Sequence, residues 1–392
     1  MTGALSDVKI LDLTQVLAGP FATTILSDFG ADIIKIEPPG GDYSWKLLNS
    51  RPIQIQKLHA WCRRRNRRSV TLNLTDDKGK AIFLKMVEEA DVVVQNFRQP
   101  VMDKLGLGYD VLKKANPRII YCALSGYGQT GPYKERMAYD PTVQAISGIM
   151  SLNGYADKPP VRIGMQLADY GGAVYAVIGI LIALHYRNIS GIGQMIDASM
   201  FDAMCHWSIG EVGGFLMSGG KRLGNKHPWA VPMDSYITKD NKYLVFGVQT
   251  DAQWRKFLKL TDREDLAAWT FNDRLNNRST IEPMAEEWVL SKTLDEAQEL
   301  LEDADLPYAK VMDILELPED PQVLIRELIW EVDDPDCGKL PGVYGTVPKL
   351  LGTPGSIRGI PPVPGQQNEE ILCGRLGYTK DDLDSFKSQG VI

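Results

Sequence analysis

Short apolar runs alternate with amphipathic stretches of helical length through roughly the first half of the chain. Five of these runs are rich in valine, isoleucine and leucine, at residues 8–14, 32–37, 69–74, 91–97 and 118–124. Glycine–proline pairs such as Gly19-Pro20 interrupt the pattern after a run. Strands that alternate with helices of about 10–15 residues are typical of βαβ units. We therefore predict an α/β fold with a mostly parallel, doubly wound sheet.

The longest uninterrupted apolar run predicts a buried helix. It extends over 12 residues from Ala173 to Leu184, inside a helix expected from about Tyr170 to Tyr186. A helix needs about 20 apolar residues to span a bilayer, so we expect no membrane segment. The first ten residues, MTGALSDVKI, lack the basic start and long apolar core of a signal peptide. These features favour a cytoplasmic protein.

The composition of the chain and the elements that it predicts change after residue 217, which indicates a second domain. We expect a large domain over 1–217, a linker rich in glycine, proline and basic residues over 218–234, and a smaller α+β domain over 235–325. Residues 326–366 are rich in glycine and proline and are predicted to form an extended linker. Residues 367–392 are predicted to form short helices that return to the large domain.

Charge and cysteine content narrow the class of protein. The 392 residues include 43 Lys and Arg against 50 Asp and Glu, a net charge of −7. Such a chain has no broad basic field for non-specific binding of nucleic acid. The five cysteines show no CxxC pair and the four histidines are scattered, so we predict neither a disulfide framework nor a metal site. Free thiols also favour a reducing compartment.

The turn after the first apolar run lacks the glycines of a dinucleotide-binding protein. Residues 14–21 read TQVLAGPF, without the GxGxxG pattern that cradles a pyrophosphate. The chain also contains no Walker A loop and no GxSxG nucleophile elbow. These absences argue against a dehydrogenase, a P-loop nucleotide hydrolase and a serine hydrolase.

A dense basic run leaves two interpretations open. Residues 63–68 read RRRNRR, with five arginines. The run is either a solvated loop before a strand or a local anion site for a small ligand that carries phosphate, because guanidinium groups bind phosphate in a bidentate manner.

Two carboxylates stand at the starts of predicted helices. Asp169 precedes the long apolar helix and is followed by Gly171 and Gly172. It is either a helix N-cap or a nucleophilic carboxylate at the positive end of a helix, where the glycines would admit a ligand. Asp140, between Tyr139 and a proline, repeats this arrangement, and the same two interpretations apply.

Taken in order, several segments resemble the class III CoA-transferase family (CaiB/BaiF type). This family contains formyl-CoA transferase, crotonobetainyl-CoA:carnitine CoA-transferase and the 2-methylacyl-CoA racemases. The segments that carry the resemblance are 11–20, 26–37, 66–74, 90–97, 125–128, 139–148 and 168–169. The resemblance covers essentially the whole chain. It implies a Rossmann-like large domain, a smaller α+β domain, and a homodimer of interlocked ring-shaped chains.

The resemblance also implies a reaction. CoA would pass from an acyl-CoA donor to a free carboxylic acid, with Asp169 as the nucleophile that forms an anhydride and then an aspartyl-CoA thioester. The Gln15 amide and backbone N–H groups at Gly171 and Gly172 are the candidate donors to the oxyanions. CoA thioester is a substrate, and no tightly bound cofactor is expected.

CoA contacts carry over from the family position by position. The expected CoA-binding residues are Val16, Leu17, Ala18, Leu72, Asn96, Phe97, Arg98, Lys104, Tyr139 and Asp140. Pro38 and Met137 stand where some members have basic residues. Arg98, Arg136 or the 63–68 run are the alternatives for those phosphate contacts.

Two alternatives to a transferase remain. The racemases carry a catalytic histidine in the segment that matches residues 137–140, whereas this chain has Tyr139 there and no histidine between residues 60 and 184. That departure disfavours racemisation. The other alternative is a CoA-binding protein without turnover, in which Asp169 is only a cap.

Trp229 and Met233 predict an acyl pocket for an acid larger than formate or oxalate, although Trp229 is equally a candidate for domain packing.

Overall fold

The computed structural model describes residues 3–392, and they divide into two compact units. The first unit comprises residues 3–147, 164–206 and 318–392, and the second comprises 148–163 and 207–317. The predicted boundaries differ from these. Residues 148–163 and 207–217, which we expected in the large domain, belong to the second unit because their contacts are made there.

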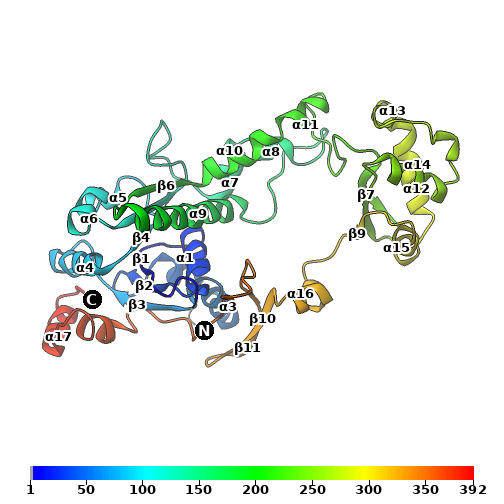
Figure 1. Ribbon diagram of the computed structural model, residues 1–392. Helices are drawn as coiled ribbons and strands as arrows, with labels where there is room; N and C mark the ends of the chain where they lie inside the picture. The colour runs from blue at the N-terminus through cyan, green and yellow to red at the C-terminus, as the bar shows by residue number, and fades with distance from the viewer. Residues whose placement is uncertain (1–2) are drawn as a thin grey trace. The chain divides into compact units, whose positions relative to one another are not determined.

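The first unit is built on a six-stranded parallel sheet in the order β3-β2-β1-β4-β5-β6 (Figure 1). The strands are β1 (Lys9–Asp12), β2 (Asp32–Glu37), β3 (Arg67–Thr71), β4 (Val92–Gln95), β5 (Ile120–Ser125) and β6 (Met195–Ser199). The α/β prediction is confirmed. The near-continuous apolar runs in β4 and β5 follow from burial of a parallel sheet on both faces.

Helices cover both faces of this sheet. Because side chains alternate along a strand, Leu11 and Asp12 of β1 point to opposite faces. Leu11 packs in the core that includes Phe83 of α4 (Asp77–Glu89). Asp12 instead accepts a hydrogen bond from Thr23 of α1 (Ala18–Asp28), so α1 lies on the other face.

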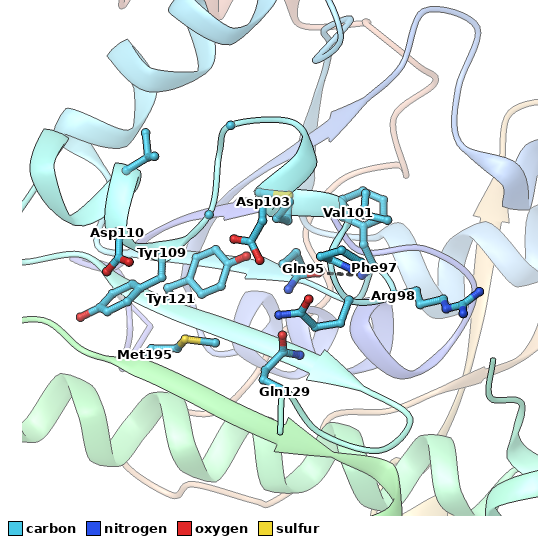
Figure 2. A pocket seen from close by; sticks show the side chains of 16 residues that line it. Gln95, Phe97, Arg98, Val101, Asp103, Tyr109, Asp110, Tyr121, Gln129 and Met195 are labelled. Atoms are coloured by element: carbon cyan, nitrogen blue, oxygen red, sulfur yellow. Dashed lines mark hydrogen bonds between the residues drawn. The ribbon is translucent and has the colours of Figure 1, made fainter. Parts of the chain in front are cut away.

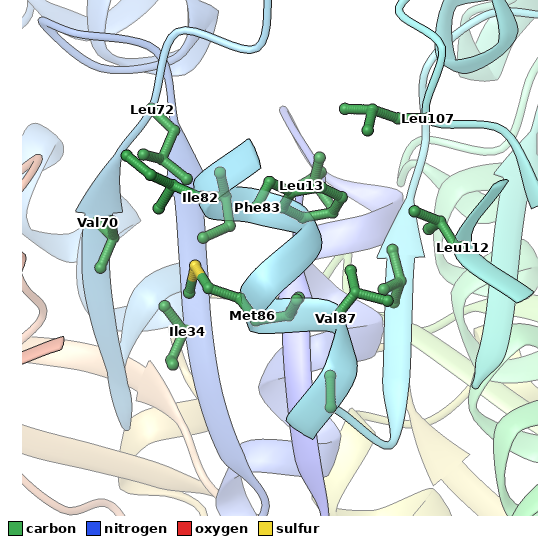
Figure 3. Packing of buried hydrophobic residues seen from close by; sticks show 14 of the residues in the cluster. Leu13, Ile34, Val70, Leu72, Ile82, Phe83, Met86, Val87, Leu107 and Leu112 are labelled. Atoms are coloured by element: carbon green, nitrogen blue, oxygen red, sulfur yellow. The ribbon is translucent and has the colours of Figure 1, made fainter. Parts of the chain in front are cut away.

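The core on the α4 face includes the end of the chain. Strand residues such as Ile34 and Val70 pack with Ile82 and Phe83 of α4 (Figure 3). Ile371, Leu383 and Val391 from the C-terminal segment belong to the same cluster. The last residues of the chain therefore help to bury the sheet that the first residues begin.

A hairpin occupies part of the segment that we predicted to be an extended linker. Strands β10 (Ile329–Asp334) and β11 (Gly338–Tyr344) pair antiparallel. Leu340 and Val343 pack against Trp61 of α3 (Ile53–Arg64). The linker prediction for 326–366 is wrong over this stretch because apolar side chains on the hairpin find a buried partner on α3.

The longest helix is α9 (Leu167–Ser190), longer than the predicted segment. By length and composition alone it could cross a membrane, but half of its most apolar stretch is buried in the protein. It packs against α1, β5 and β6. The aliphatic side chains that it leaves exposed are Val174, Ile178, Leu181, Ile182 and Ile189, and Tyr186 is exposed as well.

The second unit contains a small antiparallel sheet in the order β7-β8-β9. Its strands are β7 (Met233–Ile237), β8 (Tyr243–Gly247) and β9 (Tyr308–Lys310), and its longer helices are α12 (Asp251–Leu260), α14 (Arg278–Leu290) and α15 (Leu294–Asp303). Phe246 packs with Trp254, Phe257 and Trp288 in its aromatic core. This unit has the α+β character that the sequence predicts.

The remaining elements are short. They are α2 (Tyr43–Leu48), α5 (Val101–Lys104), α6 (Tyr109–Ala115), α7 (Asp140–Ile146), α8 (Ile149–Leu152), α10 (Met200–Gly210), α11 (Val212–Met217), α13 (Phe271–Asn276), α16 (Pro321–Ile325) and α17 (Lys380–Ser388), with 3-10 turns at Glu264–Leu266 and Leu317–Glu319 and a π-helical turn at Glu369–Cys373.

Candidate active site

A cavity of about 290 Å³ opens at the carboxyl ends of β1, β4 and β5 in the first unit. The strand order places β2 on one side of β1 and β4 on the other, so the chain reverses direction across the sheet at this point. Ligands of open parallel sheets bind at such a switch point. The lining residues are Gln15, Val16, Leu17, Ala18, Asn96, Phe97, Arg98, Leu124, Ser125, Gly126, Ala138, Tyr139, Asp140, Asp169 and Met200.

The cavity brings together most of the predicted site residues. The ten that line it are Gln15, Val16, Leu17, Ala18, Asn96, Phe97, Arg98, Tyr139, Asp140 and Asp169. They come from the ends of the two strands β1 and β4 and from the starts of α1, α7 and α9. Residues that are far apart in sequence therefore meet at one edge of the sheet.

A larger cavity of about 490 Å³ lies beside the first and shares Phe97 and Arg98 with it. Figure 2 shows Asp103 and Asp110 in its wall, and Arg98 extending away from both. Each cavity thus has two carboxylates in its wall, because Asp140 and Asp169 line the smaller one, and charge alone does not distinguish the two. The smaller cavity lies at the switch point of the sheet and includes the start of α1, so it fits a CoA thioester better, although the larger one has more volume.

The turn after β1 is fixed by the Asn96 side chain. The Gln15 backbone N–H donates to Asn96 Oδ1 at 2.8 Å, and Asn96 Nδ2 donates to the Gln15 carbonyl at 2.9 Å. Because both ends of the amide are used, Asn96 acts on the position of Gln15. The Gln15 side chain makes no hydrogen bond to residues 3–392, so it is available to a ligand.

Val16 adopts a backbone conformation that is unfavourable for a β-branched residue. Its φ of 67° lies in the left-handed region, which residues other than glycine rarely occupy. The Val16 N–H donates to Ser44 Oγ at 3.0 Å, and its carbonyl accepts from Arg63 Nη1 at 3.1 Å. Such strain persists only where neighbouring groups hold it, and it occurs often at functional sites.

A buried ionic network lies beneath this turn. Asp12 accepts hydrogen bonds from Thr14, from Thr23 and, at 2.7 Å, from Arg67 Nη1. Arg67 Nη2 also donates to the Pro20 carbonyl at 2.6 Å. These contacts tie β1, α1 and β3 together, so the turn at Gln15 rests on a rigid base.

The start of α1 offers unpaired backbone donors. The N-cap residue Leu17 makes no side-chain cap, and the first turn contains no acidic residue. The N–H groups of Leu17, Ala18 and Gly19 have no hydrogen-bond partner among the described residues. Because a helix N-terminus carries partial positive charge, this end of the cavity favours an anion or a developing oxyanion.

Asp140, and not Asp169, caps α9. Its Oδ2 accepts from the Ala168 N–H at 2.7 Å and from the Asp169 N–H at 3.4 Å, and its Oδ1 accepts from Gln144 Nε2 at 2.6 Å. Asp140 is 3% exposed. Its carboxylate is therefore used to hold the helix start, which argues against a direct contact between this carboxylate and CoA.

Asp169 is half-buried, and its carboxylate makes no hydrogen bond to any described residue. Burial, together with the nearby Asp140 carboxylate, raises the pKa of Asp169 from 3.8 to about 6, whereas the positive charge of Arg63 acts in the opposite direction. The interpretation of Asp169 as an N-cap is thus wrong. A carboxylate without hydrogen-bond partners and with a raised pKa is a stronger nucleophile than a solvated one.

Most of the basic run is committed to internal ion pairs. Arg64 pairs with Glu37 and Asp42, Arg65 with Asp28, Arg67 with Asp12, and Arg68 with Asp32 and Glu370. Both earlier interpretations are wrong for these four arginines, because they form neither a solvated loop nor a free anion site. Arg63 alone within the run has no ion pair to any of residues 3–392.

Four predicted site residues do not line the cavity. Leu72 is 1% exposed and belongs to the core, so it offers no surface to a ligand. Lys104 lies exposed at the end of α5. Gly171 and Gly172 lie beyond the first turn of α9, where N–H groups bond within the helix, so they are not oxyanion donors. A Cβ atom on Gly172 would lie 2.9 Å from Met200 Cγ, which shows that the glycine allows close packing.

Three contributions to the site were not predicted from the sequence. Ser44 holds the Val16 turn, and nothing in the local sequence signals this contact. Arg63 was not separated from its neighbours in the basic run. Gly126 stood in a quoted motif without a role, and a Cβ there would lie 2.1 Å from Ala138 Cβ in the cavity wall. Over residues 3–392, no group of three or more His, Cys, Asp or Glu side chains is placed to hold a metal ion.

Comparison with known proteins identifies the family of the chain. Residues 5–368 match the profile described as CoA-transferase family III. A succinyl-CoA–D-citramalate CoA-transferase from Chloroflexus aurantiacus is 32% identical over 99% of this chain and 98% of its own length. A succinyl-CoA:mesaconate CoA-transferase from Haloarcula marismortui is 34% identical over 94% of this chain and 96% of its own length.

The fold has solved counterparts as well. A crystal structure described as a CaiB/BaiF family protein from Brucella suis superposes with a TM-score of 0.80 and 31% identity, covering 95% of this chain and all of that one. The profile match extends over most of the chain, and the relatives exceed 30% identity over nearly their whole length. The chain therefore belongs to CoA-transferase family III, as the sequence motifs predicted.

Proposed function

We propose that this CoA-transferase moves CoA from an acyl-CoA donor to a free carboxylic acid, with Asp169 as its covalent nucleophile. The observation that carries the proposal is the Asp169 carboxylate, which lines the cavity at the strand ends and makes no hydrogen bond to residues 3–392. Its pKa of about 6 leaves it mostly ionised at neutral pH. CoA thioester is a substrate in this proposal, and no tightly bound cofactor is required.

The proposed reaction splits one exchange into reversible steps. An Asp169 oxygen attacks the thioester carbonyl of the donor, the C–S bond breaks, and an acyl-aspartyl anhydride and CoA thiolate form. The thiolate attacks the aspartyl carbonyl, which releases the donor's acid as a carboxylate and leaves an aspartyl-CoA thioester. The incoming carboxylate then reverses both steps. The new acyl-CoA leaves, Asp169 is regenerated, and no proton or electron is exchanged.

The oxyanions of these steps need fixed donors. We assign this role to the Gln15 side chain and to the unpaired N–H groups of Leu17 and Ala18, all of which line the cavity. Loss of one such donor typically lowers the rate by about 10²–10³-fold. The rigid base beneath the turn supports this assignment, because preorganised donors need no rearrangement during the reaction.

The phosphates of CoA require positive charge outside the reacting centre. Arg98 lines the cavity and is exposed, and Lys104 is exposed on the following α5. We propose Arg98 as the nearer phosphate contact and Lys104 as the more distant one. Arg136 is less suited, because its guanidinium stacks on the Tyr133 ring at 3.9 Å.

We propose a dicarboxylic acid as the acid substrate. The names of the two relatives include citramalate and mesaconate together with succinyl-CoA, and all three acids carry two carboxylates. The predicted pocket residues Trp229 and Met233 belong to the second unit, and their contribution to the acyl site stays a prediction.

We also propose that the protein works as a cytoplasmic homodimer of interlocked ring-shaped chains. The exposed apolar side chains of α9, such as Ile178 and Ile182, support a second copy that covers this face. The five cysteines are all free, which suits a reducing compartment. Sedimentation that gives the mass of one chain at micromolar concentration would contradict the dimer.

The test of the function compares two carboxylate variants. The enzyme is incubated with succinyl-CoA or acetyl-CoA and a panel of acids, and new thioesters are followed by mass spectrometry. We expect transfer by the wild type and by Asp202→Asn, a matched control whose pKa is also raised by burial but which lies outside the cavity. We expect no transfer by Asp169→Asn.

The other outcomes of this experiment would support a different mechanism or a different function. Transfer that survives Asp169→Asn would rule out the aspartyl mechanism. Exchange of the α-proton without acid exchange would favour a racemase, and tight CoA binding without any new thioester would favour a binding protein.

A further inference from the structure

Arg63 has unused capacity to bind an anion. It lies half-buried in the last turn of α3. Its Nη1 donates a hydrogen bond to the Val16 carbonyl and also contacts His59 Nε2. The Nη2 and Nε donors make no hydrogen bond to any residue of 3–392. A guanidinium has five N–H donors and stays charged, so most of its binding capacity remains available.

His59 holds Arg63 without neutralising it. A guanidinium can only donate, so His59 Nε2 accepts and the imidazole proton lies on Nδ1. Burial and the charges of Arg63 and Arg64 lower the pKa of His59 to about 4, so the ring is neutral at neutral pH. Arg63 therefore keeps its positive charge and has no ion-pair partner within the described part of the chain.

The position of Arg63 relates it to the reacting carboxylate. Arg63 supports the strained Val16 turn, and Val16 and Asp169 line the same cavity. Its charge lowers the pKa of Asp169, which opposes the effect of Asp140. Arg63 is thus a fixed, unpaired cation within electrostatic reach of the nucleophile.

We propose that Arg63, positioned by His59, binds the second carboxylate of a dicarboxylic acid while the first carboxylate reacts at Asp169. The proposal rests on the transferase function and names the residue that selects the acid. A dianionic acid would otherwise meet the negative charges of Asp169 and Asp140, and the cation that lines the cavity, Arg98, is assigned to a phosphate of CoA. A planar guanidinium also matches a carboxylate in geometry.

The test uses a matched pair of acids and variants of Arg63. With one acyl-CoA donor at a fixed saturating concentration, initial rates are measured against succinate and against monomethyl succinate, which keeps the reacting carboxylate but lacks the second charge. For Arg63→Gln we expect kcat/KM for succinate to fall about 10- to 100-fold, the worth of a charged hydrogen bond. The value for monomethyl succinate is expected to change less than about threefold.

Two further variants separate recognition from folding. Arg63→Lys keeps the charge but loses the planar guanidinium that can make two parallel hydrogen bonds to a carboxylate. We therefore expect kcat/KM for succinate to lie between the values of Arg63→Gln and the wild type. His59→Gln is expected to weaken use of succinate less than Arg63→Gln does, because the cation remains but is held less firmly. Thermal unfolding and CoA binding are measured for each variant.

Specific outcomes would overturn the proposal. An equal fall for both acids would mean that Arg63 supports the turn or the reacting carboxylate, and no fall would mean that another group reads the second charge. A wild type that uses both acids equally well, or that uses only monocarboxylates, would overturn it too. A wild type that transfers CoA to no acid would instead reject the proposed function itself.

Discussion

Two groups of charged side chains in the first unit differ in whether their charges are paired. Arg64, Arg65, Arg67 and Arg68 each face one or two carboxylates, and Arg65 and Arg67 are almost fully buried. In and beside the cavity, Asp169 and Arg63 have no hydrogen-bonded partner of opposite charge. The same residue types therefore serve as structure in one region and remain available to a ligand in the other.

The difference has a physical reason. Removing one partner from a buried ion pair leaves an uncompensated charge, which makes the paired region resistant to change. A half-buried charge without a partner lowers stability but keeps its capacity to bind or react. The site thus combines a rigid network of buried ion pairs with a few charged groups that have no ion-pair partner.

The largest effect is expected at Asp169, where activity and stability change in opposite directions. Asp169→Asn is expected to lower transfer by about 10⁴-fold or more, the scale seen when a nucleophile is removed. The pKa of this carboxyl is raised from 3.8 to about 6, so ionisation costs stability as the pH rises through that range. At pH 7 the variant is expected to gain up to about 3 kcal/mol in free energy of unfolding.

Urea unfolding at two pH values checks the sign. The gain is expected at pH 7 and is expected to vanish below about pH 4, where the carboxyl is protonated in both states. A variant that is less stable than the wild type at pH 7 would show that the Asp169 carboxylate is paired.

The next largest effect is expected in the buried ionic network around Asp12. Arg67→Met leaves Asp12 uncompensated, so we expect a loss of about 3–5 kcal/mol in free energy of unfolding, measured by urea titration. The control is Lys80→Met, because Lys80 pairs with Asp77, whose side chain is 99% exposed, and such a pair contributes little. Similar losses of unfolding free energy in both variants would show that the buried Arg67–Asp12 pair contributes no more than a surface ion pair.

The smallest effect is a shift in pH dependence. The profile of kcat/KM for the wild type is expected to rise with pH through about 6, because Asp169 must be ionised to attack. Asp140→Asn removes the negative charge that adds to the effect of burial, so the rise is expected to move to lower pH.

Asp202→Asn is the control for this profile, because Asp202 lies outside the cavity. A profile that stays unchanged in Asp140→Asn, or moves to higher pH, would show that Asp140 does not influence the nucleophile.

The sequence predicted the scaffold better than the partners of individual charges. Alternating runs predicted the parallel sheet, and the motifs located the turn at Gln15 and the carboxylate at Asp169. Which of two carboxylates caps α9 depends on Asp140, which lies 28 residues before Ala168 in sequence. Local sequence does not contain that information.

The same limit explains the basic run and the hairpin. Arg67 finds its partner Asp12 at a separation of 55 residues, so no local pattern distinguishes it from Arg63. In the segment that was predicted to be a linker, the glycine and proline content obscured the strand pattern of β10 and β11. The apolar side chains of these strands are buried only because they pack against Trp61 of α3. Long-range packing decided both cases.

The most direct test of the account is to trap the covalent intermediate. The wild-type enzyme is mixed with an acyl-CoA donor without acceptor acid, treated with hydroxylamine or digested directly, and its peptides are mapped by mass spectrometry. We predict a CoA thioester or a hydroxamate on the side chain of Asp169 and no adduct in Asp169→Asn. An adduct on another residue, or continued transfer without any adduct at Asp169, would contradict the account.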